Sequence, residues 1–358
     1  MLRTKADERR PLELGDLKLK NRIVMAPMTR NRANADGVPN DLMADYYGQR
    51  GDAGLIVAEG TWPSATGQAY CRQPGIATPE QIKGWQKVTE AVHAKGGLIV
   101  LQIMHGGRIG SHHIKAPGTE TVAPSALLAA GEVVTDNVGM QPYDMPRALG
   151  THEVKAIVQE HAQAARNARL AGFDGVELHC TSGYLPMQFL CSGTNLRTDE
   201  YGGNAVHRAR FAIECLREMG QAIGAGRVGL RVNPGNTFND TSDENSAQTH
   251  IELMQQAAQL GLAYLHVMRA PLAEINAFEM ALTHFGDRLI LNDGFGPENS
   301  EDALSSFENS ALSYARHFIG NPDFVQRLQN GHPLTRFDRK TLYTPGAAGY
   351  TSYAPHTA

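Results

Sequence analysis

The sequence has few cysteines and no unit that would hold a nicotinamide in a domain of its own. Its 358 residues contain four scattered cysteines, at positions 71, 180, 191 and 215, and no CxxC pair. Such usage is typical of reduced thiols, so we expect a cytoplasmic protein without a disulfide framework. The sequence also offers no Rossmann-type strand–GxGxxG–helix unit, which argues against a separate dinucleotide-binding domain.

Other absences exclude membranes and nucleic acids. The longest apolar runs, such as Gly97–Ile103, have the length of a strand and are too short to span a bilayer. The charged N-terminal segment MLRTKADERRPLEL lacks an apolar core, which indicates that there is no signal peptide. The formal net charge is −4 and the isoelectric point is about 6.4, so electrostatics favours neither nucleic acid nor an anionic membrane as a partner. We expect a small-molecule substrate and a monomer or homodimer.

Eight short and almost wholly apolar runs alternate with helical patterns along the chain. Such continuous hydrophobicity is typical of strands that are buried on both faces. The runs are Arg22–Ala26, Gly54–Ala58, Leu98–Gln102, Gly175–His179, Val228–Val232, Tyr264–Val267, Leu289–Leu291 and Leu312–Ala315. The predicted helices are Pro79–Lys95, with Thr78 as N-cap, Thr151–Ala171, Ala205–Ile223, Asn245–Leu260 and Glu298–Ser306. At roughly 150 residues per domain the length suggests two domains, but eight alternating units favour one α/β domain, a (β/α)8 TIM barrel over residues 1–358.

One interval, Met104–Gly150, interrupts this alternation. It is rich in Gly, Pro, His and Thr and has strand-like pieces at Thr119–Ala123 and Glu132–Thr135. Because it follows the third strand, it should lie over the C-terminal mouth of the barrel, where the active sites of this fold lie. We interpret it as a lid over a substrate pocket; the alternative is a solvated surface insertion. Residues 1–20 are expected to include a small element that covers the barrel floor.

The segment Gly172–Arg210 carries the most chemistry. His179 ends a predicted strand and therefore lies at the mouth, and Ser182 and Tyr184 follow within six residues. An imidazole and a hydroxyl can donate hydrogen bonds to a carbonyl or nitro oxygen, and a phenol can protonate carbon if its phenolate is stabilised. The alternative is a histidine at a strand end and a packed tyrosine.

This segment resembles the signature of the Old Yellow Enzyme family of FMN-containing ene-reductases, and the similarity extends along almost the whole chain. It is carried by NRIVMAPMTR at 21–30, YYGQRGDAGLIVAEGT at 46–61, LQIMHGGR at 101–108, RTDEYGG at 197–203, GLRVNP at 229–234, NDGF at 292–295, FIGNPDF at 318–324 and AAGYTSY at 347–353. The resemblance implies a barrel that binds FMN and uses NAD(P)H as reductant.

The resemblance also implies where the flavin ring lies. The turn Pro27-Met28-Thr29 would meet the isoalloxazine, with the Thr29 hydroxyl on the ring carbonyl O4. Gly60 would let the ring approach the backbone, and Gln102 would bond to the pyrimidine edge. These contacts would tune the redox potential of the cofactor.

Arg231 resembles the family arginine near N1–C2=O, which stabilises the reduced anionic flavin. A buried arginine is costly without an anion or a strong dipole; the alternative is an internal salt bridge. The phosphate loops depart from the family pattern, because Asp293-Gly294 stands for a usual Gly-Gly and Ala315-Arg316 for a usual Gly-Arg. We keep Gly294 and Arg316 as phosphate-binding residues, and Asp293 would point away or weaken binding.

The substrate side shows two further departures. Ser182 stands where the family usually has Asn or His, which predicts weaker carbonyl polarisation, a bridging water or a bulkier substrate. Met104 stands where one branch has Trp, and a flexible thioether should widen the pocket. Tyr70 and Tyr350 match pocket tyrosines of the family, with ordinary loop tyrosines as the alternative. The adjacent histidines 112 and 113 lack a ligand framework, so we expect no metal.

The expected reaction is the reduction of an activated C=C bond of an α,β-unsaturated carbonyl or nitro compound. NAD(P)H would pass a hydride to flavin N5 and leave, as in ping-pong kinetics. His179 and Ser182 would hold the substrate oxygen while Tyr184 protonates the α-carbon. The alternatives are a nitrate-ester or nitroaromatic reductase, an enone isomerase on the same site, and a flavin-free binding protein.

Overall fold

The protein is built around a closed barrel of parallel strands, seen in a computed structural model that describes residues 8–272 and 274–356. Each strand pairs with the next one along the chain, and the last pairs with the first. The strands are β3 (Ile23–Met25), β4 (Leu55–Val57), β5 (Ile99–Ile103), β10 (Gly175–Cys180), β11 (Val228–Val232), β12 (Tyr264–Met268), β13 (Leu289–Asn292) and β14 (Ala311–Tyr314). The predicted (β/α)8 TIM barrel is confirmed, and each predicted strand overlaps an observed one.

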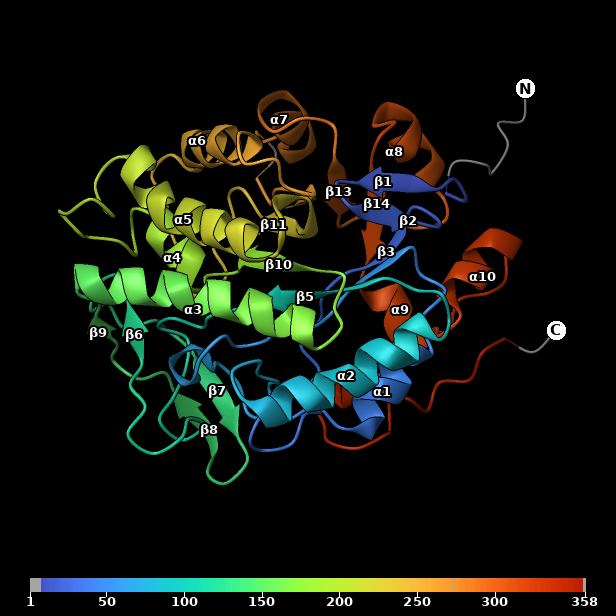
Figure 1. Cartoon of the computed structure of the whole chain (residues 1–358), viewed down its shortest axis with the longest axis horizontal. Helices are drawn as coiled ribbons and strands as arrows, with labels where there is room; N and C mark the ends of the chain where they lie inside the picture. The colour runs from blue at the N-terminus through green and yellow to red at the C-terminus, as the bar shows by residue number, and fades with distance from the viewer. Residues whose placement is uncertain (1–7, 273, 357–358) are drawn as a thin grey trace.

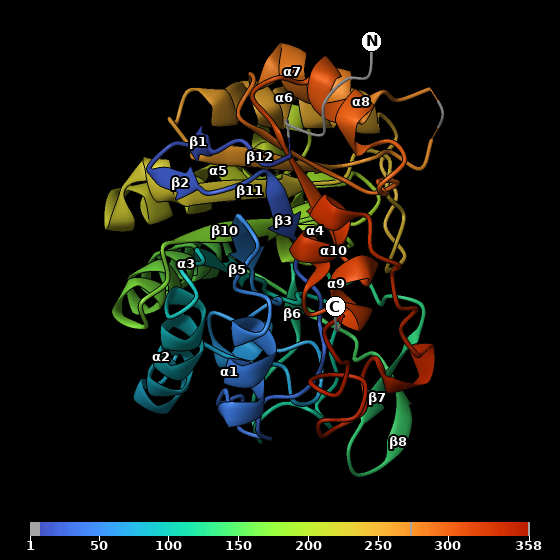
Figure 2. The same ribbon diagram turned by 90° about the vertical axis from the view of Figure 1, so that its right-hand side faces the viewer.

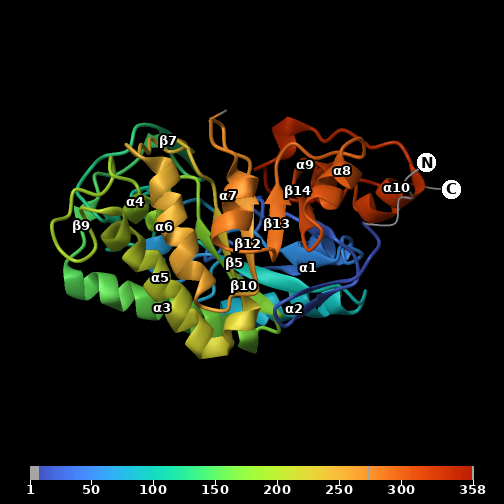
Figure 3. The same ribbon diagram turned by 90° about the horizontal axis from the view of Figure 1, so that it is seen from above.

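Helices surround the barrel on the outside, where α3, α5, α6 and α7 follow one another around one side (Figures 1 and 3). The longer helices are α2 (Pro79–His93), α3 (Thr151–Leu170), α5 (Ala205–Ile223) and α6 (Ser246–Ala258). The shorter ones are α1 (Asp41–Gly48), α4 (Leu185–Leu190), α7 (Ala277–His284), α8 (Ser300–Ser306), α9 (Arg316–Gly320) and α10 (Phe324–Asn330). Every predicted helix is present, α5 with the predicted bounds.

Helix α2 begins where the sequence predicts, because its first turn is capped. The Thr78 hydroxyl accepts a hydrogen bond from the Gln81 backbone N–H, and the Gln81 side chain accepts one from the Thr78 N–H. Pro79 occupies the first helical position, where its missing N–H costs nothing. Helix α3 begins at Thr151, and the Glu153 carboxylate accepts from the Gly150 N–H at 2.7 Å.

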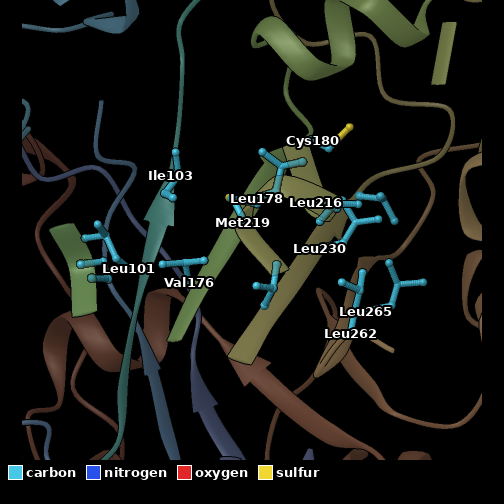
Figure 4. Packing of buried hydrophobic residues seen from close by; sticks show 14 of the residues in the cluster. Leu101, Ile103, Val176, Leu178, Cys180, Leu216, Met219, Leu230, Leu262 and Leu265 are labelled. Carbon is cyan, nitrogen blue, oxygen red and sulfur yellow. The ribbon is translucent and has the colours of Figure 1, made fainter. Parts of the chain in front are cut away.

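Alternate residues of each barrel strand face the helices and the barrel interior. Val176 and Leu178 of β10 belong to the same apolar cluster as Leu216 and Met219 of α5 (Figure 4). Glu177, which lies between them, bonds to His266 of β12. Because β11 separates β10 from β12 in the sheet, this bond crosses the barrel interior. This period of two therefore places polar side chains inside the barrel.

A hairpin closes the barrel floor, as expected for residues 1–20; residues 1–7 of that interval lie outside the described part. Strands β1 (Leu12–Leu14) and β2 (Leu17–Leu19) pair antiparallel. Their leucines share a buried cluster with Val24, Leu55 and Val100 of the barrel. The floor is thus filled by side chains, which leaves the opposite end as the open one.

The interval 104–150 forms the lid that was predicted. It contains β6 (Val122–Ala123), β7 (Glu132–Thr135), β8 (Gly139–Pro142) and β9 (Arg147–Ala148). Strands β7 and β8 form an antiparallel hairpin on the side of the barrel opposite to β1–β2 (Figures 1 and 2). The strand-like pieces expected at 119–123 and 132–135 correspond to β6 and β7.

Residues 224–229, GAGRVG, do have the GxGxxG spacing, but they lie between α5 and β11, the reverse of the strand–loop–helix order that binds dinucleotides. All four cysteines are buried free thiols. Within the described ranges, none of the helices has the length and apolarity needed to span a bilayer.

Candidate active site

Most of the residues predicted to bind the cofactor lie at the C-terminal mouth of the barrel. The C-terminal ends of parallel strands share one end of a closed barrel, so residues at or just after these ends border one opening. The set comprises Pro27, Met28 and Thr29 after β3, Gly60 after β4, Gln102 in β5, His179 in β10, Arg231 in β11, Gly294 after β13 and Arg316 at the start of α9.

A buried carboxylate lies among these residues. Glu177 accepts hydrogen bonds from Gln102 Nε2 at 2.8 Å, from Tyr264 Oη at 3.1 Å and from His266 Nδ1 at 2.8 Å. The second ring nitrogen of His266 lies 2.7 Å from Ser313 Oγ. Although burial opposes the charge, the nearby His266 and Arg231 lower the pKa of Glu177, so it is a carboxylate.

The Arg231 guanidinium is buried and only partly paired. Its Nη2 donates to Asn292 Oδ1 at 2.8 Å, whereas its Nη1 has no hydrogen-bond partner among the described residues. Its direct partner is therefore an amide rather than the carboxylate of an internal salt bridge. A buried N–H without a partner costs about 1–3 kcal/mol, so this site favours a ligand that brings an acceptor atom.

Two cavities at the mouth share Thr29 and Tyr343. The first, of about 410 Å³, is bordered by Tyr70 and Tyr184 and, on the lid side, by Glu132, Val133, Val134, Met140 and Tyr143. The second, of about 460 Å³, is bordered by Met28, Ala315 and Arg316. Thr29 therefore lies between a lid-covered cavity and one that ends at a cation.

Tyr184 and His179 are brought together. The two rings meet edge to face with centroids 4.9 Å apart, and the Tyr184 hydroxyl lies 2.8 Å from that of Tyr70. Burial raises the pKa of Tyr184 well above its ordinary value, so the phenol keeps its proton at neutral pH. Burial and the charge of Arg231 lower the pKa of His179 to about 3, so its imidazole is neutral. The site thus holds a neutral acid beside a neutral hydrogen-bonding ring.

Ser182 adopts a conformation that is uncommon for serine. Its φ is 56°, in the left-handed region, where residues other than glycine, asparagine and aspartate pay roughly 1 kcal/mol. Its hydroxyl lies 2.7 Å from that of Thr181, and its carbonyl accepts from Asn239 Nδ2 at 2.8 Å. Because a hydroxyl both donates and accepts, Ser182 can accept from Thr181 and still donate to a substrate oxygen together with His179.

Gly60 and Met104 depend on each other. A Cβ at Gly60 would lie 2.6 Å from the Met104 sulfur, so a larger residue here would require the Met104 side chain to shift. Met104 is buried in a cluster that also contains Val133, Tyr143 and Tyr184. The thioether therefore fills space beside the pocket, and the expectation that it widens the pocket is not supported.

Tyr350 lies away from the pocket. Its ring is fully buried, stacks on Tyr46 with centroids 3.9 Å apart, and has the Arg32 guanidinium 4.8 Å from its centroid. A ring covered in this way has no face left for a substrate. The prediction that Tyr350 lines the substrate pocket is not supported by this placement, and the pocket proposed below leaves it out.

The loop after β13 is exposed and has a left-handed backbone. Asp293 and Gly294 have φ values of 79° and 78°, and a Cβ at Gly294 would lie 3.1 Å from Arg269 Nε. The Arg269 guanidinium stacks over Phe278, and Arg316 begins α9 across the second cavity. Two cations, Arg269 and Arg316, therefore lie at this end of the mouth. Asp293, between β13 and Gly294, places a carboxylate in the same loop.

Sequence reasoning missed several residues of the site. Glu177 and His266 had a signal, since each is a polar residue inside an otherwise apolar strand. Arg269 also had one, because it directly follows β12. Phe238 and Tyr343 had none, because nothing in the sequence shows that the loop after β11 and the C-terminal segment meet at one cavity.

The histidines of the lid are engaged with a carboxylate. His112 Nδ1 lies 2.8 Å from Asp144 Oδ1, and the two histidine rings lie 4.0 Å apart. In the part of the chain that the structure describes, no three His, Cys, Asp or Glu side chains are grouped as metal ligands would be.

Comparisons with known proteins agree with this geometry. A sequence model of the NADH:flavin oxidoreductase / NADH oxidase family matches residues 10–335. A probable flavin mononucleotide-dependent alkene reductase of Leishmania infantum is 40% identical over 350 residues, 96% of each chain. A putative 12-oxophytodienoate reductase 2 of Oryza sativa subsp. japonica is 37% identical over 96% of this chain and 92% of that protein.

Solved structures give the same result. Morphinone reductase in complex with tetrahydroNAD has a TM-score of 0.93 and 40% identity over 98% of both chains. The old yellow enzyme homologue from Zymomonas mobilis has a TM-score of 0.92 and 36% identity over 97% of this chain and 99% of that one. The chain therefore belongs to the NADH:flavin oxidoreductase / NADH oxidase family, the Old Yellow Enzymes, and is an NAD(P)H-dependent FMN oxidoreductase.

Proposed function

We propose that this oxidoreductase reduces the activated C=C bond of α,β-unsaturated carbonyl or nitro compounds. The observation that carries the proposal is the protonated Tyr184 phenol, which borders a lid-covered cavity together with Thr29 and packs against a neutral His179. A buried acid beside a hydrogen-bonding ring is what protonation of carbon next to an activated carbonyl requires.

The mouth fits FMN. Among the described residues Arg231 Nη1 has no acceptor, which the pyrimidine carbonyl of the ring would supply, and Gln102 stands two strands away, on the other side of β10. Thr29 and the turn Pro27-Met28 would meet the ring, and Gly294 and Arg316 would hold the phosphate, with Arg269 as an added cation. When bound, FMN would supply the hydride transfer: it would take a hydride from NAD(P)H and then give it to the alkene.

The side chains of the pocket prepare the alkene for that hydride. His179 would donate a hydrogen bond to the carbonyl or nitro oxygen, and the Ser182 hydroxyl would donate a second one while it accepts from Thr181. This withdraws electrons from the β-carbon, the position that accepts the hydride. Tyr184 would then give its proton to the α-carbon, and the Tyr70 hydroxyl at 2.8 Å would stabilise the resulting phenolate.

NAD(P)H and the alkene would use this mouth in turn. The only GxGxxG run that we find in the sequence lies in the wrong place for a dinucleotide-binding turn. A shared site predicts ping-pong kinetics, with the two half-reactions separable in time. The similarity to a probable flavin mononucleotide-dependent alkene reductase supports the same assignment.

Tyr184→Phe tests the proposal. The variant should keep the rate at which NAD(P)H reduces the flavin and should lose roughly 10²- to 10⁴-fold in the rate at which 2-cyclohexenone reoxidises it. Stopped-flow absorbance at the flavin bands measures each half-reaction separately. Tyr353→Phe, which removes a hydroxyl that accepts from the Asp338 N–H outside the site, is the matched control. Equal loss in both half-reactions would contradict the acid role of Tyr184.

A further inference from the structure

Glu177 is fully buried and accepts every hydrogen bond that it makes. Its Oε1 accepts from Gln102, and its Oε2 accepts from Tyr264 and His266. The mechanism proposed above gives Glu177 no part, and none of its three hydrogen-bond partners borders either of the two cavities described at the mouth. A buried carboxylate is costly unless it is well paired, so its presence inside the barrel calls for an explanation.

Other residues hold the carboxylate in one orientation. Tyr264 reaches Glu177 across the space that a side chain at residue 229 would fill, because a Cβ at Gly229 would lie 2.3 Å from the Tyr264 ring. His266 is neutral, since burial lowers its pKa, so its Nδ1–H donates to Glu177 and its Nε2 accepts from the Ser313 hydroxyl. Three strands thus fix the position of the two carboxylate oxygens.

This arrangement determines which way the Gln102 amide faces. A carboxylate can only accept hydrogen bonds, so the side of the amide that meets Glu177 has to be the NH₂ group. The amide oxygen, Oε1, is left on the other side, and among the described residues no group donates to it. Glu177 therefore makes Gln102 an acceptor for whatever lies at the mouth.

Arg231 is a hydrogen-bond donor at the same end of the barrel, whereas Gln102 Oε1 is an acceptor. Glu177 is in register with Gln102 on one side, and on the other the next inward residue of β10, His179, is in register with Arg231. Arg231 Nη1 is a donor without a partner. The barrel end thus presents one fixed acceptor and one fixed donor.

We propose that Glu177 is a positioning residue that makes the Gln102–Arg231 pair specific for a ring edge carrying an N–H next to a carbonyl. The proposal rests on the proposed function, because the pyrimidine edge of FMN is such an imide. Gln102 Oε1 would accept from the ring N3–H, and Arg231 would donate to the neighbouring carbonyl oxygen. If the amide were turned over, its NH₂ group would face the N3–H and the bond would be lost.

The test uses the holoprotein loaded with ¹⁵N-labelled FMN and follows the N3–H by NMR, a readout that does not depend on turnover. In the wild-type chain the N3–H should exchange slowly with solvent. Glu177→Gln lets the neighbour donate or accept, and Glu177→Asp keeps the charge but is one methylene too short to reach Gln102. Both variants should show faster N3–H exchange, a shift toward the spectrum of Gln102→Leu, and roughly 10- to 100-fold weaker FMN binding.

Thr89→Val is the matched control, because it removes a buried hydroxyl that donates to the Ala171 carbonyl outside the barrel and leaves the Glu177 carboxylate and its partners in place; the N3–H of this variant should resemble that of the wild type. A wild-type N3–H signal in both Glu177 variants would overturn the proposal. If one Glu177 variant does not fold, the other gives the same comparison. If neither folds, the wild type is compared with Gln102→Leu. N3–H exchange that is equally fast in both overturns the proposal, and slower exchange in the wild type supports it. A wild-type chain that binds no FMN would instead overturn the proposed function.

Discussion

The hydroxyl oxygens of Tyr70 and Tyr184 lie 2.8 Å apart, although 114 residues separate the two tyrosines along the chain. Tyr70 comes from the loop before α2 and Tyr184 from the loop after β10, and their rings are perpendicular. Burial raises the pKa of Tyr70 to about 12, so it keeps its proton when Tyr184 loses one. Tyr70 is therefore placed to donate to the phenolate that carbon protonation leaves behind.

This relationship predicts the behaviour of Tyr70→Phe. A hydrogen bond to a charged group contributes about 1.5–3 kcal/mol, so the variant should slow reoxidation of the flavin by 2-cyclohexenone by roughly 10- to 100-fold. Reduction by NAD(P)H should be unchanged, because no proton reaches carbon in that half-reaction. Stopped-flow absorbance at the flavin bands measures both half-reactions, and the loss should be the same at every pH from 6 to 10, because burial raises the pKa of both phenols above that range.

The double variant Tyr70→Phe/Tyr184→Phe supplies the control for this prediction. If the two hydroxyls act as a pair, the double variant should be no slower than Tyr184→Phe alone. Independent, multiplicative losses would show that Tyr70 affects the reaction in another way.

Asp293 predicts a gain of function on substitution. Its backbone is left-handed, a conformation that glycine adopts without a Cβ clash. Its carboxylate also stands in the loop that precedes Gly294, where a phosphate would bind. Asp293→Gly should therefore bind FMN more tightly and unfold at a higher temperature.

Asp293→Asn separates the two effects, because it removes the charge and tolerates the same backbone. If charge dominates, both variants should gain FMN affinity by several-fold; if the backbone dominates, only the glycine variant should gain thermal stability. Fluorescence titration of the apoprotein with FMN and calorimetric melting measure the two quantities. Unchanged FMN affinity in both variants would mean that Asp293 points away from the phosphate.

Glu59 predicts how stability depends on pH. Its buried carboxyl accepts from the Tyr47 hydroxyl at 3.1 Å and from the Arg30 N–H at 3.3 Å, and burial raises its pKa from 4.5 to about 7. Between these values the folded chain holds a proton that the unfolded chain has released. Its contribution is therefore complete below pH 4.5 and is lost as the pH rises to 7, by on the order of 3 kcal/mol.

Glu59→Gln should remove this loss. Urea unfolding of both proteins at pH 4.5 and pH 8 should show the wild type losing more stability between the two pH values than the variant. The same difference in both proteins would show that Glu59 is already ionised in the folded state at pH 4.5.

Some elements and site residues could be predicted from the sequence, and others could not. The strands and helices were predictable because apolar runs and capping residues such as Thr78 act locally. The position of His179 at the mouth was predictable because polar residues at strand ends meet at one mouth in any barrel, whereas the roles of Arg231 and Gln102 came from the family resemblance and stay predictions. Tyr350 was misplaced, since only the folded chain shows that its ring stacks on Tyr46 instead of facing the pocket.

Residues that act through another residue were the hardest to predict. The part played by Glu177 depends on which way the Gln102 amide faces, and that follows from bonds between strands that are distant in sequence. Whether a larger residue fits at position 60 depends on where the Met104 sulfur packs. Neither relationship has a pattern that can be read along one segment.

The outer side of the first cavity predicts a preference for substrates with a bulky apolar part. Val134, Met140, Phe238 and Tyr343 border it and are 53%, 51%, 59% and 58% exposed. They come from the β7–β8 hairpin, the loop after β11 and the C-terminal segment, so the apolar rim surrounds the opening. A substituent that covers them gains about 25 cal/mol per Å² of apolar surface removed from water.

Enones with a large alkyl or aryl group should therefore have lower KM values than 2-cyclohexenone. Phe238→Ser should raise KM for the bulky enones by roughly 3- to 10-fold, which corresponds to partial loss of one aromatic contact. It should leave KM for 2-cyclohexenone unchanged, because a small ring does not reach the rim. Leu170→Ser, which changes an equally exposed leucine at the end of α3, controls for general effects of surface polarity. If Phe238→Ser changes KM equally for small and bulky enones, the rim is not the part of the site that recognises substrate size.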